Sequence, residues 1–503
     1  MNVLIRTDSS ELIGTGHVFR CLALAEALAA RDVTVTFLCR DLAGNVMELV
    51  QQAGVSLLQL PRPMHQAGAS SPWFGGVDWE TDLLETAKAI AARKPVADWL
   101  IVDHYGIDHR WESSLRPYVG RIAVIDDLAD RVHDCDLLLD ANLQAASGER
   151  YRSLVPPHAV VLSGPRYALL RPQFKQARAL LRPRSGEVKR ILVFFGGTDI
   201  SNETQKALDA LGVIRRPEIS VDVVVGGTNP YRVSIAAWCS RRKNVRFHCQ
   251  VANMAELMVA ADLFIGSGGT SAWERCAVGL PGLAMTVAEN QEPAMRRMAE
   301  EVRLLYLGRA QDVSAESIAR AVEGLLALPE LVAILAGRSA SLVDGKGAER
   351  MARYLQLPAI QLRRARAGDC KSIYHWRNAE ETRRHSFDPS EMSFAAHESW
   401  FQTALAATDR ILLIGEARGE PIGVIRYDLS EDHAGVSVYL VPGKHGQGYG
   451  AQLLRTGSEW LRQAHPEIRE IRAEILGANL ASQTAFRQAG YEPHSGTYKK
   501  LLR

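Results

Sequence analysis

A histidine stands directly after a glycine-rich turn near the start of the chain. In "GTGH", Gly14 and Gly16 allow a tight turn and a close approach of the backbone to a ligand, and His17 follows at the start of a predicted helix. The first amides of a helix are unpaired and carry a partial positive charge, which suits an anionic leaving group and disfavours a second positive charge. A neutral imidazole can accept a proton, so His17 is a candidate general base. A histidine that only caps or packs the helix start fits this spacing equally well.

A second glycine-rich stretch, "GSGGTSAWE", joins a predicted strand to a predicted helix. Gly268 and Gly269 follow the strand, and Thr270 and Ser271 open the helix. Backbone amides and hydroxyl donors in this arrangement cradle an anion. Glu274 lies one helical turn beyond Thr270, where its carboxylate can accept both hydroxyls of a ribose. Ser271 and Glu274 also have the spacing of a capping box, so an ordinary helix start is the alternative.

Further polar residues stand at the predicted ends of other strands. "FFGGTD" places Gly196 and Gly197 after a strand of the same half, which strengthens the prediction of a phosphate-binding edge. One strand further on, "ENQ" offers Asn290 and Gln291 to sugar hydroxyls or phosphate. The strand-end side chains that either bind sugar or cap a turn are Asp103, His104, Asp126 and Asp127. No convincing loop carries the D-x-D pair of metal-using transferases, so we expect that no metal is required.

Another set of glycines precedes a predicted helix near the C-terminus. In "VSVYLVPGKHGQGYGAQLL" a strand is followed by Gly443, Gly446, Gly448 and Gly450. Spaced glycines before a helix allow successive N–H groups to wrap a pyrophosphate, and a splayed strand end can bind a pantetheine arm as an added strand would. Taken alone, these glycines also fit a flexible loop. The downstream motif "NLASQTAFRQAGYE", with Asn479, makes the pair much more specific.

The motifs lie at the ends of strands that alternate with helices. From residue 2 onward, short β-branched runs alternate with amphipathic stretches, and a second such series begins near Arg190. This alternation predicts βαβ units and two parallel, doubly wound sheets, which bind ligands at the carboxyl ends of their strands. After a linker predicted at Gln356–Gln361, successive antiparallel strands with helices packed on them predict an α+β module. The polar segment 61–76 is predicted to be a loop.

Length and composition limit the class of protein. A chain of 503 residues is too long for a single hydrophobic core, and its length predicts about three domains. The net charge of +2 gives no bias towards nucleic acid as a partner. The absence of a membrane-spanning apolar run and of a signal core predicts a cytoplasmic protein with no membrane partner. Seven scattered cysteines without a C-x-x-C pair predict reduced thiols, and neither structural disulfides nor a zinc site.

The first two thirds of the chain resemble the nucleotide-sugar hydrolases of pseudaminic acid biosynthesis. The resemblance lies in the order and spacing of "RTDSSELIGTGHVFRCLALAEAL", "IVDHYG", "GPRYALLRPQF", "VFFGGTD", "NMAELMVAADLFIGSGGTSAWERCAVGLPGLAM" and "ENQ". It implies a GT-B fold, related to the glycosyltransferase that makes peptidoglycan lipid II, with Rossmann-like halves at residues 1–160 and 161–355. It also implies hydrolysis of UDP-2,4-diacetamido-2,4,6-trideoxy-β-L-altropyranose to UDP and the free sugar.

Individual roles follow from this resemblance. His17 matches the histidine that activates water for attack on the anomeric carbon, Asn290 and Gln291 match positions at the sugar, and the backbone around Met254 faces the uracil. The positions that the resemblance assigns to UDP are Gly16, Gly196, Gly197, Met254, Gly268, Gly269, Thr270, Ser271 and Glu274.

Residues 362–503 resemble the GNAT acetyltransferases, an α+β fold. "HWRNAEETRRHSF" and "HESWF" resemble more narrowly the acetyltransferase of the same pathway, which acetylates the 4-amino group of a UDP-linked amino sugar with acetyl-CoA. The resemblance places the CoA pyrophosphate on the backbone of residues 445–450 and the pantetheine beside Leu440 and Val441. The positions that it assigns to acetyl-CoA are Leu440, Val441, His445, Gly446, Gly448, Tyr449, Gly450 and Asn479.

The chain departs from the acetyltransferase pattern at two positions. His445 stands where a glutamine or arginine usually opens the glycine motif, and Phe486 stands where a tyrosine commonly protonates the departing thiolate. Tyr491 or a water could take over that proton transfer, or the thiolate could leave unassisted. Glu474 could accept the amine proton through a water, or be an ordinary solvent-facing strand residue. Trp376 of "HWRN" also fits a plain core position.

These observations predict a bifunctional enzyme that acetylates a UDP-linked amino sugar in its C-terminal module and hydrolyses the UDP-diacetamido sugar in its N-terminal one. One alternative is a glycosyltransferase that passes the sugar to an acceptor and carries an acyltransferase module. The other is a non-catalytic sensor of nucleotide sugar and CoA.

Overall fold

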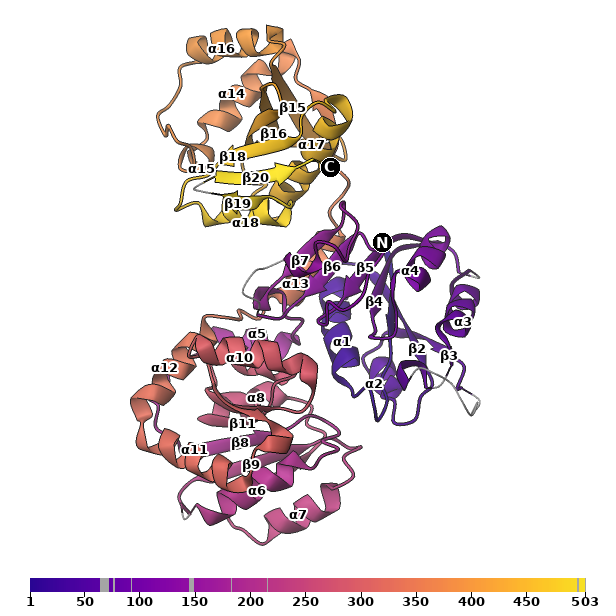
Figure 1. The fold of residues 1–503 in the computed structure, drawn as a ribbon, viewed down its shortest axis with the longest axis vertical. Coiled ribbons are helices and arrows are strands. Elements are labelled where there is room, and N and C mark those ends of the chain that lie inside the picture. The colour runs from indigo at the N-terminus through magenta and orange to yellow at the C-terminus, as the bar shows by residue number, and fades with distance from the viewer. Residues whose placement is uncertain are drawn as a thin grey trace. The chain divides into compact units, whose positions relative to one another are not determined.

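A parallel sheet covered by helices forms the first half of the N-terminal unit (Figure 1). Its strand order is β3-β2-β1-β4-β5-β6-β7, and every neighbouring pair is parallel. The sequence of β1, "NVLIRT", is buried at every position after the first, as expected of a strand covered on both faces. The strands are β1 (Asn2–Thr7), β2 (Thr34–Arg40), β3 (Ser56–Leu60), β4 (Ala97–Asp103), β5 (Val119–Ile125), β6 (Leu137–Asp140) and β7 (Val160–Ser163). The helices are α1 (Gly16–Ala29), α2 (Met47–Gln52), α3 (Trp79–Ala91) and α4 (His109–Leu115).

The second half repeats this design with its own core. Its six strands are all parallel, in the order β10-β9-β8-β11-β12-β13. Successive residues of β8 pack into different hydrophobic clusters, Leu192 on one face of the sheet and Val193 on the other. The strands are β8 (Arg190–Phe194), β9 (Ser220–Val225), β10 (Val245–Cys249), β11 (Leu263–Ser267), β12 (Gly282–Thr286) and β13 (Leu305–Arg309). The helices are α5 (Pro172–Ala179), α6 (Glu203–Val213), α7 (Arg232–Ser240), α8 (Met254–Ala260), α9 (Ser271–Ala277), α10 (Glu292–Glu300), α11 (Ala315–Ala327), α12 (Pro329–Ala340) and α13 (Gly347–Leu355).

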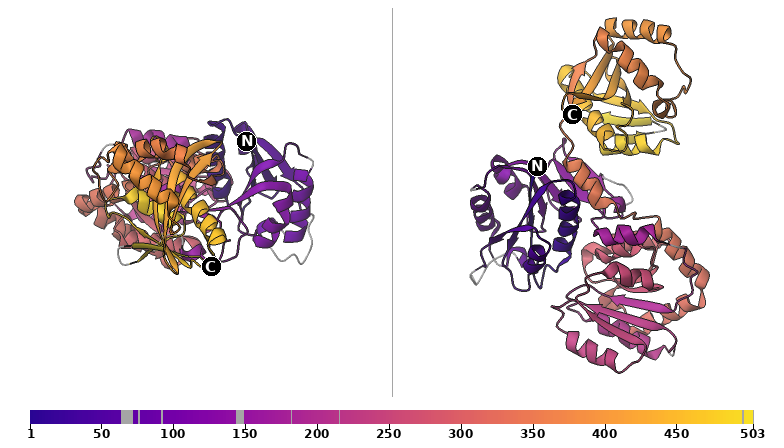
Figure 2. Two further views of the ribbon diagram at one scale, coloured as in Figure 1. Left: turned by 90° about the horizontal axis from the view of Figure 1, so that it is seen from above. Right: turned by 180° about the vertical axis from the view of Figure 1, so that it is seen from behind.

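The C-terminal unit is built on a mixed sheet of order β14-β15-β16-β17-β18-β20-β19, in which β17 and β18 run parallel. Helices α14 and α16 pack on one face through Ile373 and Phe401, and α17 packs on the other through Leu453 and Leu461 (Figure 1, Figure 2). The strands are β14 (Gln361–Arg364), β15 (Arg410–Ala417), β16 (Glu420–Leu429), β17 (His433–Leu440), β18 (Glu470–Glu474), β19 (Glu492–His494) and β20 (Thr497–Leu501). The helices are α14 (Cys370–Asn378), α15 (Glu380–Arg383), α16 (Phe394–Ala406), α17 (Tyr449–Ala464) and α18 (Leu480–Gln488).

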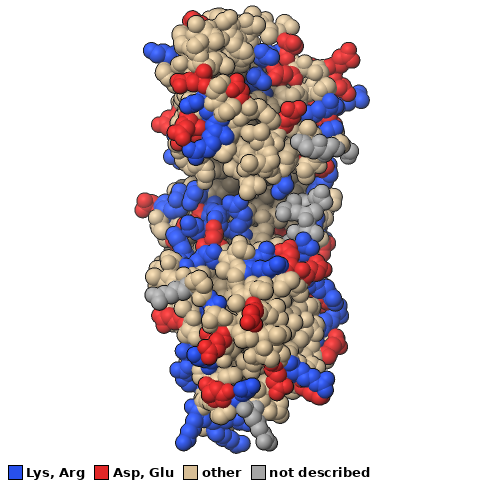
Figure 3. All heavy atoms as spheres, turned by 90° about the vertical axis from the view of Figure 1, so that its left-hand side faces the viewer, with Lys and Arg blue, Asp and Glu red and all other residues tan. Residues whose placement is uncertain are grey.

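The structure is a computed structural model that describes residues 1–63, 72–75, 77–91, 93–143, 149–181, 183–214, 216–494 and 497–502. The two units are Met1–Ala352 and Arg353–Arg503. The loop predicted for residues 61–76 lies outside the described residues at positions 64–71 and 76. Within the described ranges, no helix combines the length and apolar character needed to cross a bilayer. The face drawn in Figure 3 carries both acidic and basic side chains, in keeping with the small net charge.

Candidate active sites

The predicted site residues of the N-terminal unit lie at the switch point of each parallel sheet, where the chain begins to add strands on the other side of the central strand. In each sheet the chain moves outward from a central strand, β1 or β8, first to one side and later to the other. Ligands of doubly wound sheets bind at the carboxyl ends of the two strands that flank this switch point. In the first sheet these ends carry Asp8 and Asp103, and in the second they lead into Gly196 and Gly268.

His17 is the second residue of α1 and forms a hydrogen bond with a buried carboxylate. Its Nδ1 lies 2.6 Å from Oδ1 of Asp103, the last residue of β4. The His17 side chain is 7% exposed and Asp103 is fully buried. Burial opposes the ionisation of Asp103, but Arg20 and His17 outweigh it and hold the pKa of this carboxyl below its usual range. Because a carboxylate only accepts hydrogen bonds, Asp103 fixes the proton on Nδ1 and leaves the Nε2 lone pair of His17 available.

Arg20 binds the same carboxylate one turn later in α1. Its Nε lies 2.6 Å from Oδ2 of Asp103 and its Nη2 lies 2.5 Å from Oδ1. The same Nη2 is 3.1 Å from Nδ1 of His17, and Nη1 donates to Oδ2 of Asp127 at 3.1 Å. Cys21 completes the set, with its Sγ 3.3 Å from Oδ2 of Asp103. Sequence reasoning missed Arg20, although its i,i+3 spacing from His17 places both side chains on one helix face.

Tyr105 contacts both His17 and Asn290, and Asn290 belongs to the second half of the unit. The two rings meet edge to face with centroids 4.6 Å apart. The Tyr105 hydroxyl accepts a hydrogen bond from Nδ2 of Asn290 at 3.2 Å and also bonds the Asp127 carboxylate. Asn290 lies in a 3-10 turn, Glu289–Gln291, directly before α10. The predicted sugar-binding asparagine therefore reaches the predicted base through one tyrosine.

The three glycine-rich turns of the N-terminal unit lie against one another. A methyl group added at Gly197 would lie 3.4 Å from Oγ1 of Thr15, and one added at Gly16 would lie 3.6 Å from Oγ1 of Thr270. One added at Gly269 would lie 3.6 Å from Nε2 of Gln291. Across the described part of the unit, several amides in these turns have no backbone acceptor: Gly16, His17, Gly196, Gly197, Gly269, Thr270 and Ser271. Unpaired amides converging from three turns are the donors that a diphosphate requires.

Glu274 does not form the capping box that its spacing allows. Thr270 is the N-cap of α9 and makes no side-chain capping bond, while Ser271 Oγ donates to the Ser267 carbonyl at 3.5 Å. The Glu274 carboxylate instead lies 3.5 Å from Nη2 of Arg171, and burial raises the pKa of Glu274 while Arg171 opposes that rise. Ser271 and Glu274 therefore do not form a capping box. Helix α9 has seven residues, from Ser271 to Ala277.

Arg171 extends this region towards the other half of the unit. Its guanidinium lies over the ring of Phe19 in α1 at 5.4 Å, and Nη1 donates to the Ala252 carbonyl at 3.3 Å. The Met254 side chain is buried in the core of the second half. Asp126, by contrast, accepts from Ala129 N and Tyr151 Oη inside the first half and has a structural role.

In the C-terminal unit, strand β17 separates from β18 as predicted. The pairing of the two strands ends at Gly435, although β17 continues to Leu440. The N–H of Val441 donates to the Ile422 carbonyl on the opposite side. Since backbone groups alternate along a strand, Leu440 directs its N–H and C=O to the open edge and Val441 does not. The backbone of Leu440 could therefore pair with an extended pantetheine arm. The N–H of Val441 could not, because it already donates to Ile422.

The glycine loop that follows β17 presents a run of unpaired amides. Gly443, Gly446 and Gly448 have φ of +79°, +70° and +96°, values that favour glycine. No described backbone acceptor engages the N–H groups of residues 445–451, and no side chain caps α17. His445 belongs to this loop, and its Nδ1 lies 2.9 Å from Oε2 of Glu381. The geometry is that of a pyrophosphate cradle at the start of a long helix.

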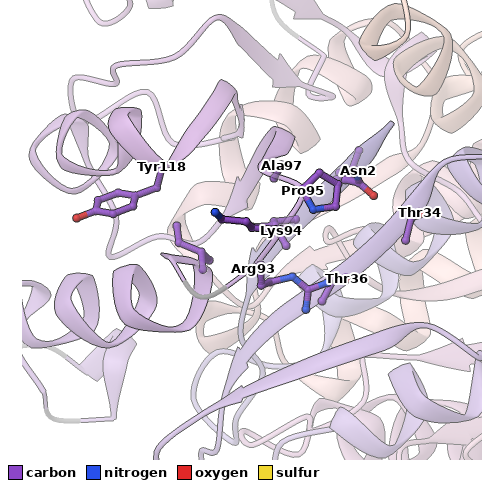
Figure 4. Close-up of a pocket in the computed structure, with 11 residues that line it drawn as sticks. Asn2, Thr34, Thr36, Arg93, Lys94, Pro95, Ala97 and Tyr118 are labelled. Atoms are coloured by element: carbon purple, nitrogen blue, oxygen red, sulfur yellow. Dashed lines mark hydrogen bonds between the residues drawn. The ribbon is translucent and has the colours of Figure 1, made fainter.

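One hollow of the N-terminal unit lies away from the candidate site of that unit (Figure 4). It is found near the amino ends of β1 and β2, at the edge of the sheet opposite to the carboxyl ends that carry Asp8 and Asp103. Its lining includes Asn2, Thr34 and Arg93, and no predicted site residue lies there.

Comparison with known proteins identifies the C-terminal unit. Residues 360–492 match the acetyltransferase (GNAT) domain family. The C-terminal unit is a GNAT acetyltransferase domain. Together with the two parallel sheets that precede it, this match confirms the predicted fold class of two Rossmann-like domains, the composition of a GT-B fold, followed by an α+β GNAT domain.

The N-terminal three fifths of the chain are homologous to a nucleotide-sugar hydrolase. The UDP-2,4-diacetamido-2,4,6-trideoxy-beta-L-altropyranose hydrolase of Campylobacter jejuni is 27% identical over 302 residues, which are 60% of this chain and 97% of that protein. An uncharacterized protein of Methanocaldococcus jannaschii is 22% identical over 509 residues, 98% of this chain and 97% of its own. Among solved structures, MurG of Acinetobacter baumannii covers 71% of this chain and 99% of its own, with 12% identity and a TM-score of 0.49.

Three residues of the GNAT domain make contacts inside the domain, and a fourth faces the solvent. Tyr491 is 2% exposed and its hydroxyl hydrogen-bonds Ser458 inside the core, so it is not available to protonate a thiolate. Glu474 is exposed on β18, in line with the alternative interpretation. Asn479 caps α18 by accepting from Ser482 N at 3.0 Å. Asn378 of "HWRN" binds the backbone of Met392 through both of its amide atoms.

Proposed function

We propose that the N-terminal unit hydrolyses a UDP-linked diacetamido sugar to UDP and the free sugar. The hydrolase of C. jejuni, by its name, acts on such a compound, and the alignment covers nearly its whole length. The observation that carries the proposal is the His17–Asp103 pair, which leaves Nε2 of His17 free as a base beside three turns with unpaired amides.

In the proposed reaction, a water oxygen bonds to the anomeric carbon as the bond from that carbon to the β-phosphate oxygen breaks. The bonding electron pair leaves with the phosphate, and a water proton passes to Nε2 of His17. The amides around Gly197, Gly269 and Thr270 stabilise the charge that develops on the diphosphate. Asn290 and Gln291 hold the sugar, and Glu274 holds the ribose. Positioning the water next to one base suffices because a nucleoside diphosphate is a good leaving group.

The proposed activity of the GNAT domain is transfer of an acetyl group from acetyl-CoA to the amino group of a UDP-linked amino sugar. The amine nitrogen bonds to the acetyl carbon, the carbon–sulfur bond breaks, and CoA leaves as its thiolate while the amine loses a proton. The amides of residues 445–451 bind the pyrophosphate, and the open edge at Leu440 binds pantetheine. With Tyr491 buried, a water delivers the proton or the thiolate leaves unassisted.

The presence of both units in one chain supports two consecutive steps. The M. jannaschii protein aligns along both units, so the same combination occurs elsewhere. Acetylation of the amino sugar would produce the diacetamido compound that the N-terminal unit consumes. A tethered second site raises the local concentration of the shared compound.

A mass-spectrometric assay with purified protein and candidate UDP-sugars tests the N-terminal activity. We expect UDP and free sugar to appear without any acceptor, and His17→Ala to lower the rate by about 10²- to 10⁴-fold, the usual contribution of a general base. Dependence of UDP release on an added sugar acceptor would instead identify a glycosyltransferase. A near wild-type rate in His17→Ala would contradict the assignment of the base.

Free thiol measured with acetyl-CoA and the UDP-amino sugar tests the GNAT domain. Thiol release that requires both compounds is the expected result. Binding of CoA without thiol release would favour the sensor alternative.

A further inference from the structure

Arg20 connects the carboxylate beside His17 to a second carboxylate. Within the proposed hydrolase function, we infer that Arg20 is a positioning residue that holds Asp103 in place and, by its charge, offsets the negative charge of this carboxylate beside His17. Neither the sequence motifs nor the homologous hydrolase's name assigns a role to this arginine.

The geometry of the contact supports a positioning role. The planar guanidinium grips both oxygens of Asp103, with Nε at 2.6 Å and Nη2 at 2.5 Å, and reaches Asp127 through Nη1 at 3.1 Å. A two-pronged contact of this kind fixes the plane of the carboxylate, which a single ammonium cannot do. Because Oδ1 of Asp103 also accepts from His17, fixing the carboxylate also fixes the orientation of the imidazole.

The charges around His17 support the electrostatic part of the inference. The groups that face its ring are Asp103 from β4, Arg20 from α1 and Tyr105 after β4. Arg20 sets one positive charge against the carboxylates of Asp103 and Asp127, and burial raises the pKa of Tyr105, so this phenol stays neutral. Without Arg20, the ring would face a buried carboxylate with no cation on it. A nearby opposite charge favours the protonated imidazolium, which cannot act as a base.

Two substitutions at this position separate charge from geometry. Arg20→Gln removes both, whereas Arg20→Lys keeps the charge but loses the two-pronged contact. Arg116→Gln is the matched control, because Arg116 also pairs with two aspartates, Asp134 and Asp136, at the far side of the same half. For each variant we would measure kcat and KM for UDP release between about pH 5 and 9, the range in which histidine titrates, together with the unfolding midpoint.

For Arg20→Gln we expect the acidic limb of the kcat/KM profile to move up by about one pH unit, with kcat reduced and KM little changed. For Arg20→Lys we expect the acidic limb of the kcat/KM profile to stay at its wild-type pH and only kcat to fall. Arg116→Gln should behave as wild type. A wild-type pH profile in Arg20→Gln, or the same shift in both Arg20 variants, would overturn the inference, as would a loss of rate that is uniform in pH and explained by unfolding.

A readout without catalysis separates this inference from the proposed function. In protein with labelled histidine, the His17 signal is assigned by its loss in His17→Gln and followed by NMR as the pH changes. We expect its titration midpoint to rise in Arg20→Gln and not in Arg116→Gln. If wild type released no UDP but this shift occurred, the hydrolase proposal would fail and the effect of Arg20 would stand. An unshifted midpoint would refute the effect of Arg20 even if UDP is released.

Discussion

Replacement of Asp103 by asparagine is the sharpest test of how His17 works. Asp103 is fully buried and accepts hydrogen bonds from His17, Arg20 and Cys21. The asparagine side chain would bring one oxygen and one NH₂ group to a place where every neighbour is a donor. If the NH₂ faces His17, the ring must move its proton to Nε2 and loses the lone pair that accepts the water proton. If it faces Arg20, the guanidinium loses one of its two bonds to residue 103 and keeps only Asp127 as a counter-charge.

Both orientations impair the base while leaving the exposed surface of the protein unchanged, because the Asp103 side chain is fully buried. The expected loss is most of the contribution of a general base, about 10²- to 10⁴-fold in kcat, which is roughly 3–5 kcal/mol in the barrier at about 1.4 kcal/mol per tenfold change. We expect KM for the UDP-sugar to change little. Removing one partner of a buried ion pair also destabilises the fold, so the unfolding midpoint should fall.

The assay is continuous detection of UDP release at saturating and at low substrate, with the unfolding midpoint measured for each preparation. Asp98→Asn is the matched control, since Asp98 lies on the same strand, is exposed and accepts one backbone N–H, from Asn2 at 2.7 Å. We expect this variant to keep kcat. If Asp103→Asn folds and keeps kcat within about threefold of wild type, well below the range for a general base, Asp103 does not orient the base and the reasoning is wrong.

Three further predictions concern backbone space and buried charge. Gly226→Ala should lower the free energy of unfolding by about 1–3 kcal/mol, because its methyl group would lie 2.3 Å from the Gly197 carbonyl oxygen. Gly324→Ala should raise the free energy of unfolding by about 0.5–1 kcal/mol, because a methyl group at this position of α11 would meet no atom within 4 Å. Chemical denaturation compares the two variants. Gly448→Ala should raise KM for acetyl-CoA without affecting UDP release, because φ at this position is +96°; an unchanged KM in the thiol assay would refute this role of the loop. Burial raises the pKa of Asp140 from 3.8 to about 7, so the folded state holds this proton more tightly than the unfolded state and stability declines as pH rises through that window. Asp140→Asn should flatten that decline in unfolding midpoints measured across it, and an equal slope in both proteins would contradict the assignment.

The elements that carry the candidate sites could be predicted because their signals are local. The apolar run of β1, the glycines that follow it and the amphipathic pattern of α1 are contiguous in sequence and match the structure closely. The same holds for β17, the glycine loop and α17 in the GNAT domain.

Contacts between residues far apart in the sequence show where two residues with open alternatives lie. Ser271 and Glu274 have capping-box spacing, yet Glu274 turns to Arg171, which is 103 residues away. Tyr491 follows the expected motif but belongs to the core, because β20 and α17 close around it. Sequence spacing gives the chemical types present, and it does not tell which face of an element those side chains occupy.

By itself, the sequence determined the classes of element, the three glycine-rich turns of the N-terminal unit, the glycine loop of the GNAT domain and His17 as the candidate base, because each depends on residues within one or two helical turns of each other. Only the tertiary structure paired His17 with Asp103 across 86 residues and linked Asn290 to Tyr105 across 185. These pairs depend on strand order. The chain places β4 beside β1, and β11 beside β8, through long crossovers, and no local pattern encodes which strand ends will meet.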